Sequence, residues 1–311
     1  MASCNHRNVR IMPANALIFL EITLFLLVLT FQSSATFAFS GGFGGGFGKK
    51  ATPPKKPNVV SQPKTVNEID ADLIESYDLG QEKYVKLYVP PDALNRQLEQ
   101  SNQQSPLKSK PTENKMSAEL NLKQYYGTGD VVWPSSFALA RLLSHCPSFV
   151  SGRNVLELGC GLGLVSASVC CHGTPKSMTL SDLDAAVLEK AYKSCTELQN
   201  QVMEVKRSVM DWNDEMTWPK QTVDTILASD VLYDAGSLQP LVNVLRHYLL
   251  PSTEPNDGNK EVLKQAMIVD PINRLNREQF CLVADTAGMD AECIPFPGMA
   301  DDFVLINVTP K

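Results

Sequence analysis

The sequence predicts an α/β fold, with a seven-stranded, mainly parallel sheet covered by helices on both faces. From about residue 118 onward, short apolar segments alternate with segments whose apolar residues recur at helical spacing. Such alternation is typical of a parallel sheet buried on both faces. A glycine-rich turn follows the first apolar strand and an aspartate follows the second, which places candidate ligand-binding groups at neighbouring strand ends.

The predicted elements follow one another to the end of the chain. Residues 154–159 form a short apolar strand that ends in glycine, and a helix is expected across 164–171. Gly288 is expected to end the last helix, because glycine favours helix C-termini. The other predicted strands are 177–182, 204–209, 223–229, 265–270, 290–296 and 303–309, and the other predicted helices are 183–200, 238–249 and 277–288.

Three segments precede this domain, which we assign to residues 118–311. Residues 1–38 carry basic residues, then an apolar run, then small residues, an order typical of a secretory signal peptide. Residues 39–66 form a basic segment rich in Gly, Pro and Lys that contains no acidic residue. Residues 67–117 contain a short strand at 83–90, followed by a polar loop.

The leader gives the prediction of localisation. A signal peptide followed by a phenylalanine and a basic, acid-free segment resembles the bipartite leaders of algae with complex plastids, so we expect a plastid protein. One alternative is a secretory-pathway protein with a flexible linker. The other is an uncleaved transmembrane anchor, although Glu21 interrupts the apolar stretch and disfavours a stable span.

Composition limits the classes of function. The net charge of -6 argues against a dedicated nucleic-acid binder, which usually has a basic face. The eight cysteines include no CxxC pair and no Cys/His cluster with zinc spacing, so we expect no metal. Cys160, Cys170 and Cys171 lie among apolar and small residues and are expected to be buried free thiols in a reducing compartment. We expect a monomer that contacts a membrane only through an uncleaved leader.

The glycine-rich turn reads ELGCGLG from Glu157 to Gly163. A nicotinamide-binding GxGxxG turn would need glycine at position 164, where the chain has Leu164. The GxGxG spacing, with an acidic residue two positions before the first glycine, resembles motif I of class I methyltransferases. That resemblance implies a turn that holds the methionine moiety and ribose of S-adenosyl-L-methionine, without a pyrophosphate cradle.

Asp182 strengthens this interpretation. It ends the second predicted strand, where an acidic side chain can accept hydrogen bonds from both ribose hydroxyls. The alternative is that Asp182 caps the following helix, a common role of aspartate. Its spacing and strand position favour the ribose.

Four further segments narrow the resemblance. They are TGDVVWPSSFALARLL before the glycine turn, DWND after the third strand, ASDVLYD at the end of the fourth and VDPINR at the end of the fifth. Together they resemble methyltransferase family 16, across about residues 118–310, and the D-x-x-Y element is the most specific. The WPSSFALARLL and DP…R elements are especially similar to the type that methylates the electron-transfer flavoprotein β subunit.

The resemblance implies a Rossmann-like class I fold and an S-adenosyl-L-methionine-dependent protein-lysine N-methyltransferase. For Trp133 and Trp212, simple core packing is the alternative to a cofactor contact. The candidate cofactor-binding residues are Trp133, Glu157, Gly159, Cys160, Gly161, Gly163, Asp182, Trp212 and Ser229.

The candidate catalytic residues are Asp230 and Tyr233 of the D-x-x-Y element. We expect Asp230 to recognise and orient the incoming lysine and Tyr233 to bound its channel; the alternative is that Asp230 caps the following turn and Tyr233 packs. Two other functions stay open, since one fold hosts many activities. They are a small-molecule N-methyltransferase and a non-catalytic protein that binds cofactor or a partner.

Overall fold

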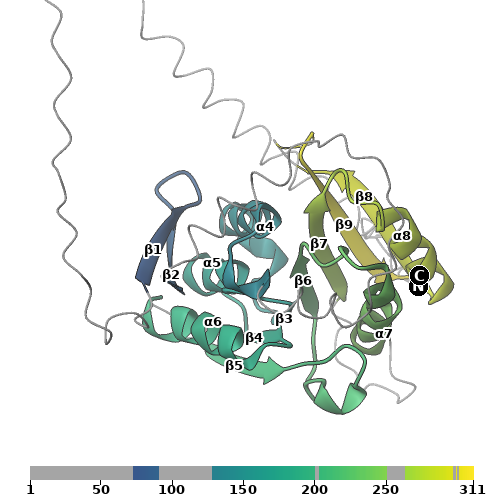
Figure 1. The fold of residues 1–311 in the computed structure, drawn as a ribbon, viewed down its shortest axis with the longest axis horizontal. Coiled ribbons are helices and arrows are strands. Elements are labelled where there is room, and N and C mark those ends of the chain that lie inside the picture. The colour runs from purple at the N-terminus through teal and green to yellow at the C-terminus, as the bar shows by residue number, and fades with distance from the viewer. Residues whose placement is uncertain (1–72, 91–127, 200–202, 251–262, 297–298, 300) are drawn as a thin grey trace, which may run out of the picture. The chain divides into compact units, whose positions relative to one another are not determined.

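A seven-stranded sheet forms the centre of the domain (Figure 1). Its strand order is β5-β4-β3-β6-β7-β9-β8; β3 to β7 run parallel to one another, and β9 runs antiparallel to both β7 and β8. The predicted mainly parallel sheet is therefore confirmed. The strands are β3 (Asn154–Leu158), β4 (Ser177–Asp182), β5 (Glu204–Val209), β6 (Thr225–Ser229), β7 (Gln265–Pro271), β8 (Met289–Pro295) and β9 (Phe303–Pro310).

This computed structural model describes residues 73–90, 128–199, 203–250, 263–296, 299 and 301–311, all within the unit Asp72–Lys311. The predicted leader (1–38), the basic segment (39–66) and the polar loop lie outside these residues. Among the helices that the structure describes, none has the length and apolar character needed to cross a membrane.

Helices cover both faces of the sheet. The first group, α4, α5 and α6, packs side by side on one face, and α7 and α8 pack together on the other (Figure 1). Burial on both faces explains why the central strands are apolar throughout, as in β6, where Ile226, Leu227 and Ala228 are all fully buried. The helices are α4 (Pro134–His145), α5 (Leu164–His172), α6 (Ala185–Glu197), α7 (Leu238–Leu249) and α8 (Arg277–Thr286), and short 3-10 turns are η1 (Thr128–Asp130), η2 (Pro147–Phe149), η3 (Glu215–Thr217) and η4 (Ala235–Ser237).

An antiparallel hairpin of β1 (Leu73–Asp78) and β2 (Tyr84–Val89) packs against α5 and α6. The backbone N–H of Tyr88 donates to Ser194 Oγ over 2.9 Å, which ties β2 to α6. Strand β2 confirms the predicted strand at 83–90. The sequence does not predict β1. None of the side chains of β1 is fully buried, and a strand without a buried face shows no clear alternation of apolar and polar residues.

The end of α8 confirms the role predicted for Gly288. The helix stops at Thr286, and Gly288 has a φ of +88°, the left-handed conformation that glycine adopts without strain.

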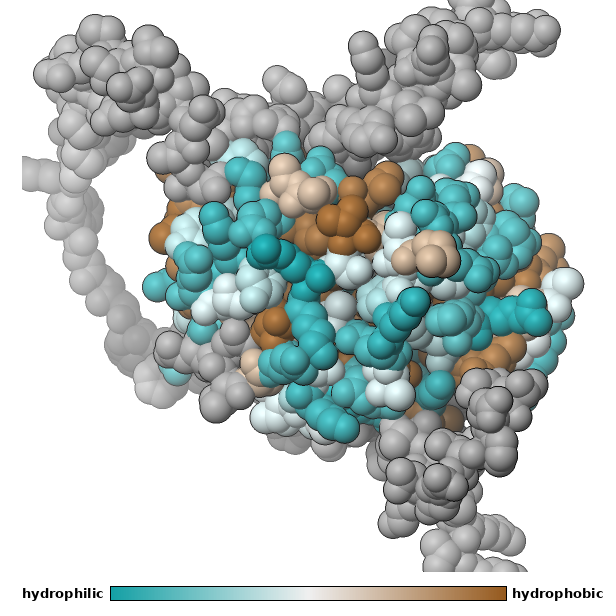
Figure 2. Space-filling model, turned by 90° about the horizontal axis from the view of Figure 1, so that it is seen from below, coloured by the Kyte–Doolittle hydropathy of each residue, from teal (hydrophilic) through white to brown (hydrophobic). Residues whose placement is uncertain are grey.

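On the face of the molecule shown in Figure 2, polar side chains surround separate apolar patches. Apolar atoms make up much of the surface of any folded domain, so scattered patches of this kind are ordinary.

Candidate active site

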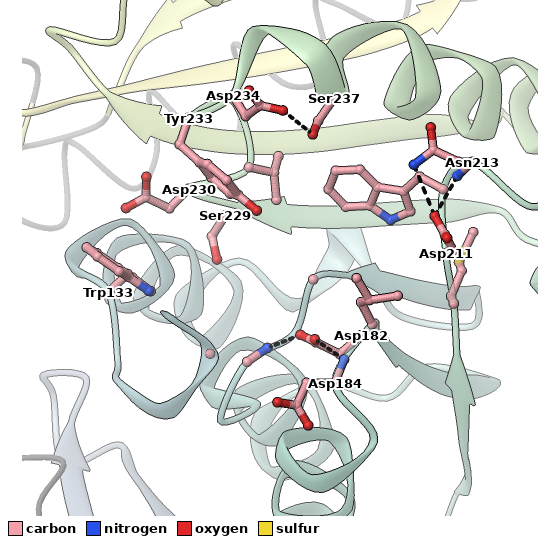
Figure 3. Close-up of a pocket in the computed structure, with 17 residues that line it drawn as sticks. Trp133, Asp182, Asp184, Asp211, Asn213, Ser229, Asp230, Tyr233, Asp234 and Ser237 are labelled. Carbon is pink, nitrogen blue, oxygen red and sulfur yellow. Dashed lines mark hydrogen bonds between the residues drawn. The ribbon is translucent and has the colours of Figure 1, made fainter. Parts of the chain in front are cut away.

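The pocket that collects most of the predicted site residues lies at the carboxyl ends of β4 and β6, beside the glycine turn that follows β3, and has a volume of about 310 Å³ (Figure 3). In an open α/β sheet, ligands bind beyond these strand ends. It is lined by Gly129, Trp133, Gly159, Gly161, Asp182, Leu183, Asp184, Met210, Asp211, Trp212, Asn213, Ser229, Asp230, Val231, Tyr233, Asp234 and Ser237.

Two glycines keep the base of this pocket open. Gly159 and Gly161 have φ angles of +62° and +51°, a region that residues with a side chain rarely adopt. A Cβ on Gly159 would lie 3.5 Å from Val231 and 3.8 Å from Trp212, both of which line the pocket. A Cβ on Gly161 would lie 3.2 Å from the carbonyl oxygen of Gly129. The turn therefore brings bare backbone close to the space where a ligand would bind.

Three residues expected beside the cofactor do not line the pocket. Gly163 precedes α5 with a φ of +80°, and a Cβ there would come within 2.7 Å of the Cβ of Ala191 in α6, so this glycine permits helix packing. Cys160 is buried with its sulfur directed to the backbone of the turn. Cys170 is buried as expected, but Cys171, near the end of α5, is exposed, so the expectation that it is buried is wrong. Glu157 is 1% exposed and accepts hydrogen bonds from the backbone N–H (2.9 Å) and the hydroxyl of Ser166.

Burial defines the charge state of Glu157. Removal from water raises the pKa of this carboxyl from 4.5 to about 8, although the hydrogen bonds from Ser166 oppose the shift. Glu157 is therefore mainly protonated at neutral pH. Its place beneath the glycine turn fits a structural role, tying β3 to α5.

Asp182 lies at the end of β4 and connects the two loops that form the base of the pocket. Its Oδ2 accepts the N–H of Gly161 at 2.9 Å, and its Oδ1 accepts the N–H of Asp184 at 3.0 Å. Asp184, not Asp182, caps α6, because its side chain accepts the N–H of Ala186 at 2.8 Å. The alternative that Asp182 caps the helix is therefore wrong. A carboxylate has about four acceptor positions, so Asp182 keeps capacity for ribose hydroxyls.

The tryptophans separate into two roles. Trp133 and Trp212 both line the pocket, and Trp212 also packs against the edge of the core. Trp218 is instead 5% exposed and donates its indole N–H to the carbonyl of Asp211 over 2.9 Å, as a packing tryptophan does. Ser229, at the end of β6, lines the pocket as well.

Asp230 follows β6 in a left-handed conformation, with a φ of +58°. Its backbone N–H donates to the carbonyl of Val269 over 2.9 Å, and its carboxylate forms an ion pair with Arg274. The guanidinium of Arg274 also binds the fully buried side chain of Asp270, with 3.0 Å between Nε and Oδ2. A non-glycine residue held at positive φ at a strand end is typical of a functional position. In Figure 3 the carboxylate of Asp230 lies between the side chains of Tyr233 and Trp133.

Arg274 is a candidate site residue that the sequence analysis does not select. The DP…R spacing after the fifth strand was the available signal, since it places the arginine four residues beyond Asp270. Tyr233, by contrast, is where the D-x-x-Y element predicted it. It is 45% exposed and lines the pocket, so it does not pack in the core.

The electrostatics of the pocket favour a cationic ligand. Among the described residues that line it, five are aspartates and none is lysine, arginine or histidine. Arg274 lies behind Asp230 and is engaged with two carboxylates. A phosphate-bearing ligand would be repelled here, whereas a sulfonium or an ammonium group would be attracted. The five aspartates are Asp182, Asp184, Asp211, Asp230 and Asp234.

A mainly parallel sheet of seven strands, with a glycine turn and a strand-end aspartate facing one pocket, is the arrangement of the class I methyltransferase fold. Residues 113–256 match the family model described as "Lysine methyltransferase".

Two curated relatives are named as lysine methyltransferases. The human protein-lysine N-methyltransferase EEF2KMT is 29% identical over 143 residues, which are 42% of this chain and 43% of the relative. The zebrafish (Danio rerio) protein N-lysine methyltransferase METTL21A is 25% identical over 125 residues, 39% of this chain and 56% of the relative. The chain thus spans less than half the length of the human relative. Among solved structures, a methyltransferase from Pyrococcus furiosus is 14% identical with a TM-score of 0.44, covering 61% of this chain and 94% of that one.

Proposed function

We propose that this protein transfers a methyl group from S-adenosyl-L-methionine to the ε-amine of a lysine in another protein. The observation that carries the proposal is the shared pocket. Its base is formed by the glycine turn and Asp182, and its opposite wall by Asp230 and Tyr233, so one cavity offers a cofactor site and an acceptor site.

The residues present fit the cofactor. Asp182 can bind the ribose hydroxyls, Trp212 offers a flat aromatic face for the adenine, and the bare backbone at Gly159 and Gly161 leaves room for the methionine moiety. The aspartate-rich lining favours a positively charged sulfonium. When bound, the cofactor supplies an electrophilic methyl group.

The acceptor lysine must lose its charge before it can attack. A free lysine has a pKa of about 10.4, so only about one amine in 2,500 is neutral at pH 7. Desolvation in the pocket lowers that pKa, while a carboxylate alone would raise it. Arg274 opposes the carboxylate of Asp230, because its positive charge disfavours a second cation beside it. Asp230 is therefore suited to hold and align the amine, and less suited to stabilise an ammonium.

Tyr233 completes the acceptor side. Its half-exposed ring at the mouth of the pocket lets a long side chain enter from outside and bounds the path beside Asp230. In-line displacement requires nitrogen, methyl carbon and sulfur to be collinear, and positioning of this kind contributes much of the rate.

The test uses radiolabelled cofactor with a protein extract and two variants. Asp230→Ala should reduce protein methylation by at least about a hundredfold, as expected for loss of an orienting group, while S-adenosylhomocysteine affinity stays within about threefold of wild type. Asp285→Asn, at an exposed position of α8 outside the pocket lining, is the matched control and should keep most of the activity. Loss of cofactor binding and methylation together in Asp230→Ala would contradict the assigned role.

The same experiment separates the two other functions. Label confined to low-molecular-weight material would indicate a small-molecule N-methyltransferase. Cofactor binding without label in any fraction would indicate a binding protein. Label that is released on hydrolysis as methyl-lysine supports the proposal, and methyl-histidine would change the acceptor.

We further propose that the protein acts in a plastid. The support is the order of the N-terminal segments, with a signal-like stretch at 1–38 and a basic, acid-free stretch at 39–66. A fluorescent protein fused behind residues 1–66 should enter plastids in an alga with complex plastids. Retention in the secretory pathway would refute this localisation and favour one of the two alternatives.

A further inference from the structure

Two cysteines far from the pocket lie in direct contact. Cys281 in α8 and Cys293 in β8 have their sulfur atoms 3.7 Å apart. Cys281 is partly buried and Cys293 is exposed, so reagents in solution can reach the pair. By contrast, Cys170 and Cys195 are buried and cannot be reached without opening the domain.

The fold explains why the two sulfurs meet. Side chains two residues apart share one face of a strand, so Met289, Ala291 and Cys293 point to the same side of β8. Met289 belongs to the core that α8 covers, and Ala291 and Cys281 pack against that core. Strand β8 is the last strand of the sheet and pairs with β9 among the described strands. Cys293 thus lies on the inner side of an edge strand, opposite the helix.

The two thiols are chemically unequal. The hydrogen bond between them lowers the pKa of Cys293 to about 7, and Arg277 adds to the effect. The same interaction, together with burial, raises the pKa of Cys281. Cys293 is accordingly the nucleophilic sulfur, since the thiolate is the reactive form, and Cys281 is the resolving one.

We propose that Cys281 and Cys293 form a redox-active dithiol that is oxidised to an intramolecular disulfide by small disulfides such as oxidised glutathione. In the first step, the Cys293 thiolate attacks the external disulfide, a mixed disulfide forms, and one glutathione thiolate leaves and takes up a proton. In the second step, Cys281 loses its proton and attacks the Cys293 sulfur, and the second glutathione leaves as a thiol. The two cysteines lose two electrons, and the external disulfide gains them.

This modification would fasten α8 to the edge of the sheet. Arg277, one turn before Cys281, donates to the carbonyls of Pro271 and Ile272, at the start of the loop that carries Arg274. The bond would close a short loop between sequence positions 281 and 293. By restricting the unfolded chain, such a closure should raise the melting temperature by roughly 5 to 10 °C. The inference does not depend on the proposed methyltransferase activity.

The test exploits the sequence. No lysine or arginine lies between Arg277 and Lys311, so trypsin releases both cysteines in the single peptide 278–311. The full-length protein is incubated with defined ratios of reduced and oxidised glutathione, alkylated with iodoacetamide and digested. We expect the peptide to carry two alkyl groups after reduction, and after oxidation to carry none and to be lighter by two hydrogen atoms than the unalkylated dithiol.

Two variants identify the roles of the sulfurs. In Cys281→Ser, the serine hydroxyl can still donate to Cys293, so the reaction should stop at a mixed disulfide and the peptide should gain one glutathione. Cys171→Ser removes an exposed cysteine on another helix and should leave the internal disulfide and the rise in melting temperature unchanged. Two glutathiones on the wild-type peptide, or full alkylation of both cysteines at ratios that oxidise Cys171, would overturn the proposal.

Discussion

Glu157 allows a quantitative prediction about the base of the pocket. Burial raises its pKa from 4.5 to about 8, so between these values the folded protein binds a proton that the unfolded chain releases. Stability therefore falls as the pH rises through this interval. At about 1.4 kcal/mol for each tenfold change, the loss amounts to about 4 kcal/mol between pH 5 and pH 9. Glu157→Gln replaces the carboxyl with a neutral group of the same shape and should remove this loss.

The assay is urea unfolding of both proteins at pH 5, 7 and 9. The free energy of unfolding of the variant, relative to wild type, should rise by about 4 kcal/mol across this range. Burial also raises the pKa of Asp270, to about 7. Because Asp270 is present in both proteins, its contribution to the pH dependence cancels in the difference. S-adenosylhomocysteine affinity should be the same in both. If the free energies of unfolding of the two proteins changed with pH in the same way, Glu157 could not be a buried neutral acid. A loss of affinity in the variant would instead indicate that Glu157 contacts the cofactor.

Three further predictions concern positions with clear controls. Gly163→Ala should lower the free energy of unfolding, measured in urea, by about 2–4 kcal/mol, because the added Cβ would collide with α6. The control is Gly152→Ala, where φ is +70° but the space is open, and the loss should be about 1–2 kcal/mol. Trp212→Ala should weaken S-adenosylhomocysteine binding about tenfold by calorimetry, while Trp218→Ala should destabilise the fold by about 3–5 kcal/mol. Arg274→Gln should reduce methylation of labelled extract about tenfold or more at unchanged cofactor affinity, because it leaves Asp230 without its ion pair; full activity would exclude a positioning role.

The sheet could be predicted because its strands carry their own signal. Buried parallel strands such as 223–229 are continuously apolar, and each precedes a segment with helical spacing. The order of the strands in space is not encoded in this pattern, since pairing depends on contacts between distant segments. Strand β1 could not be predicted for a related reason. It forms through its pairing with β2, and the sequence of Leu73–Asp78 alone does not indicate that pairing.

The lining of the pocket could be predicted where a motif directly follows a strand. Gly161, Asp182 and Tyr233 all line the pocket at positions that the motifs indicated. The ion pair between Asp230 and Arg274 could not be predicted, because the two residues are 44 positions apart and meet only when β6 and β7 pair. The motif also grouped Glu157 and Gly163 with the cofactor, although one is buried beneath the turn and the other serves helix packing.

The most direct test of the cofactor site is calorimetric titration of the purified protein with S-adenosylhomocysteine. We predict saturable binding of one ligand per chain, with an affinity that falls at least about tenfold in Asp182→Ala, since a lost hydrogen-bonding carboxylate costs about 1.4 kcal/mol or more. An absence of binding heat across several temperatures in the wild-type protein, with the fold intact by circular dichroism, would contradict the assignment of this pocket to the cofactor.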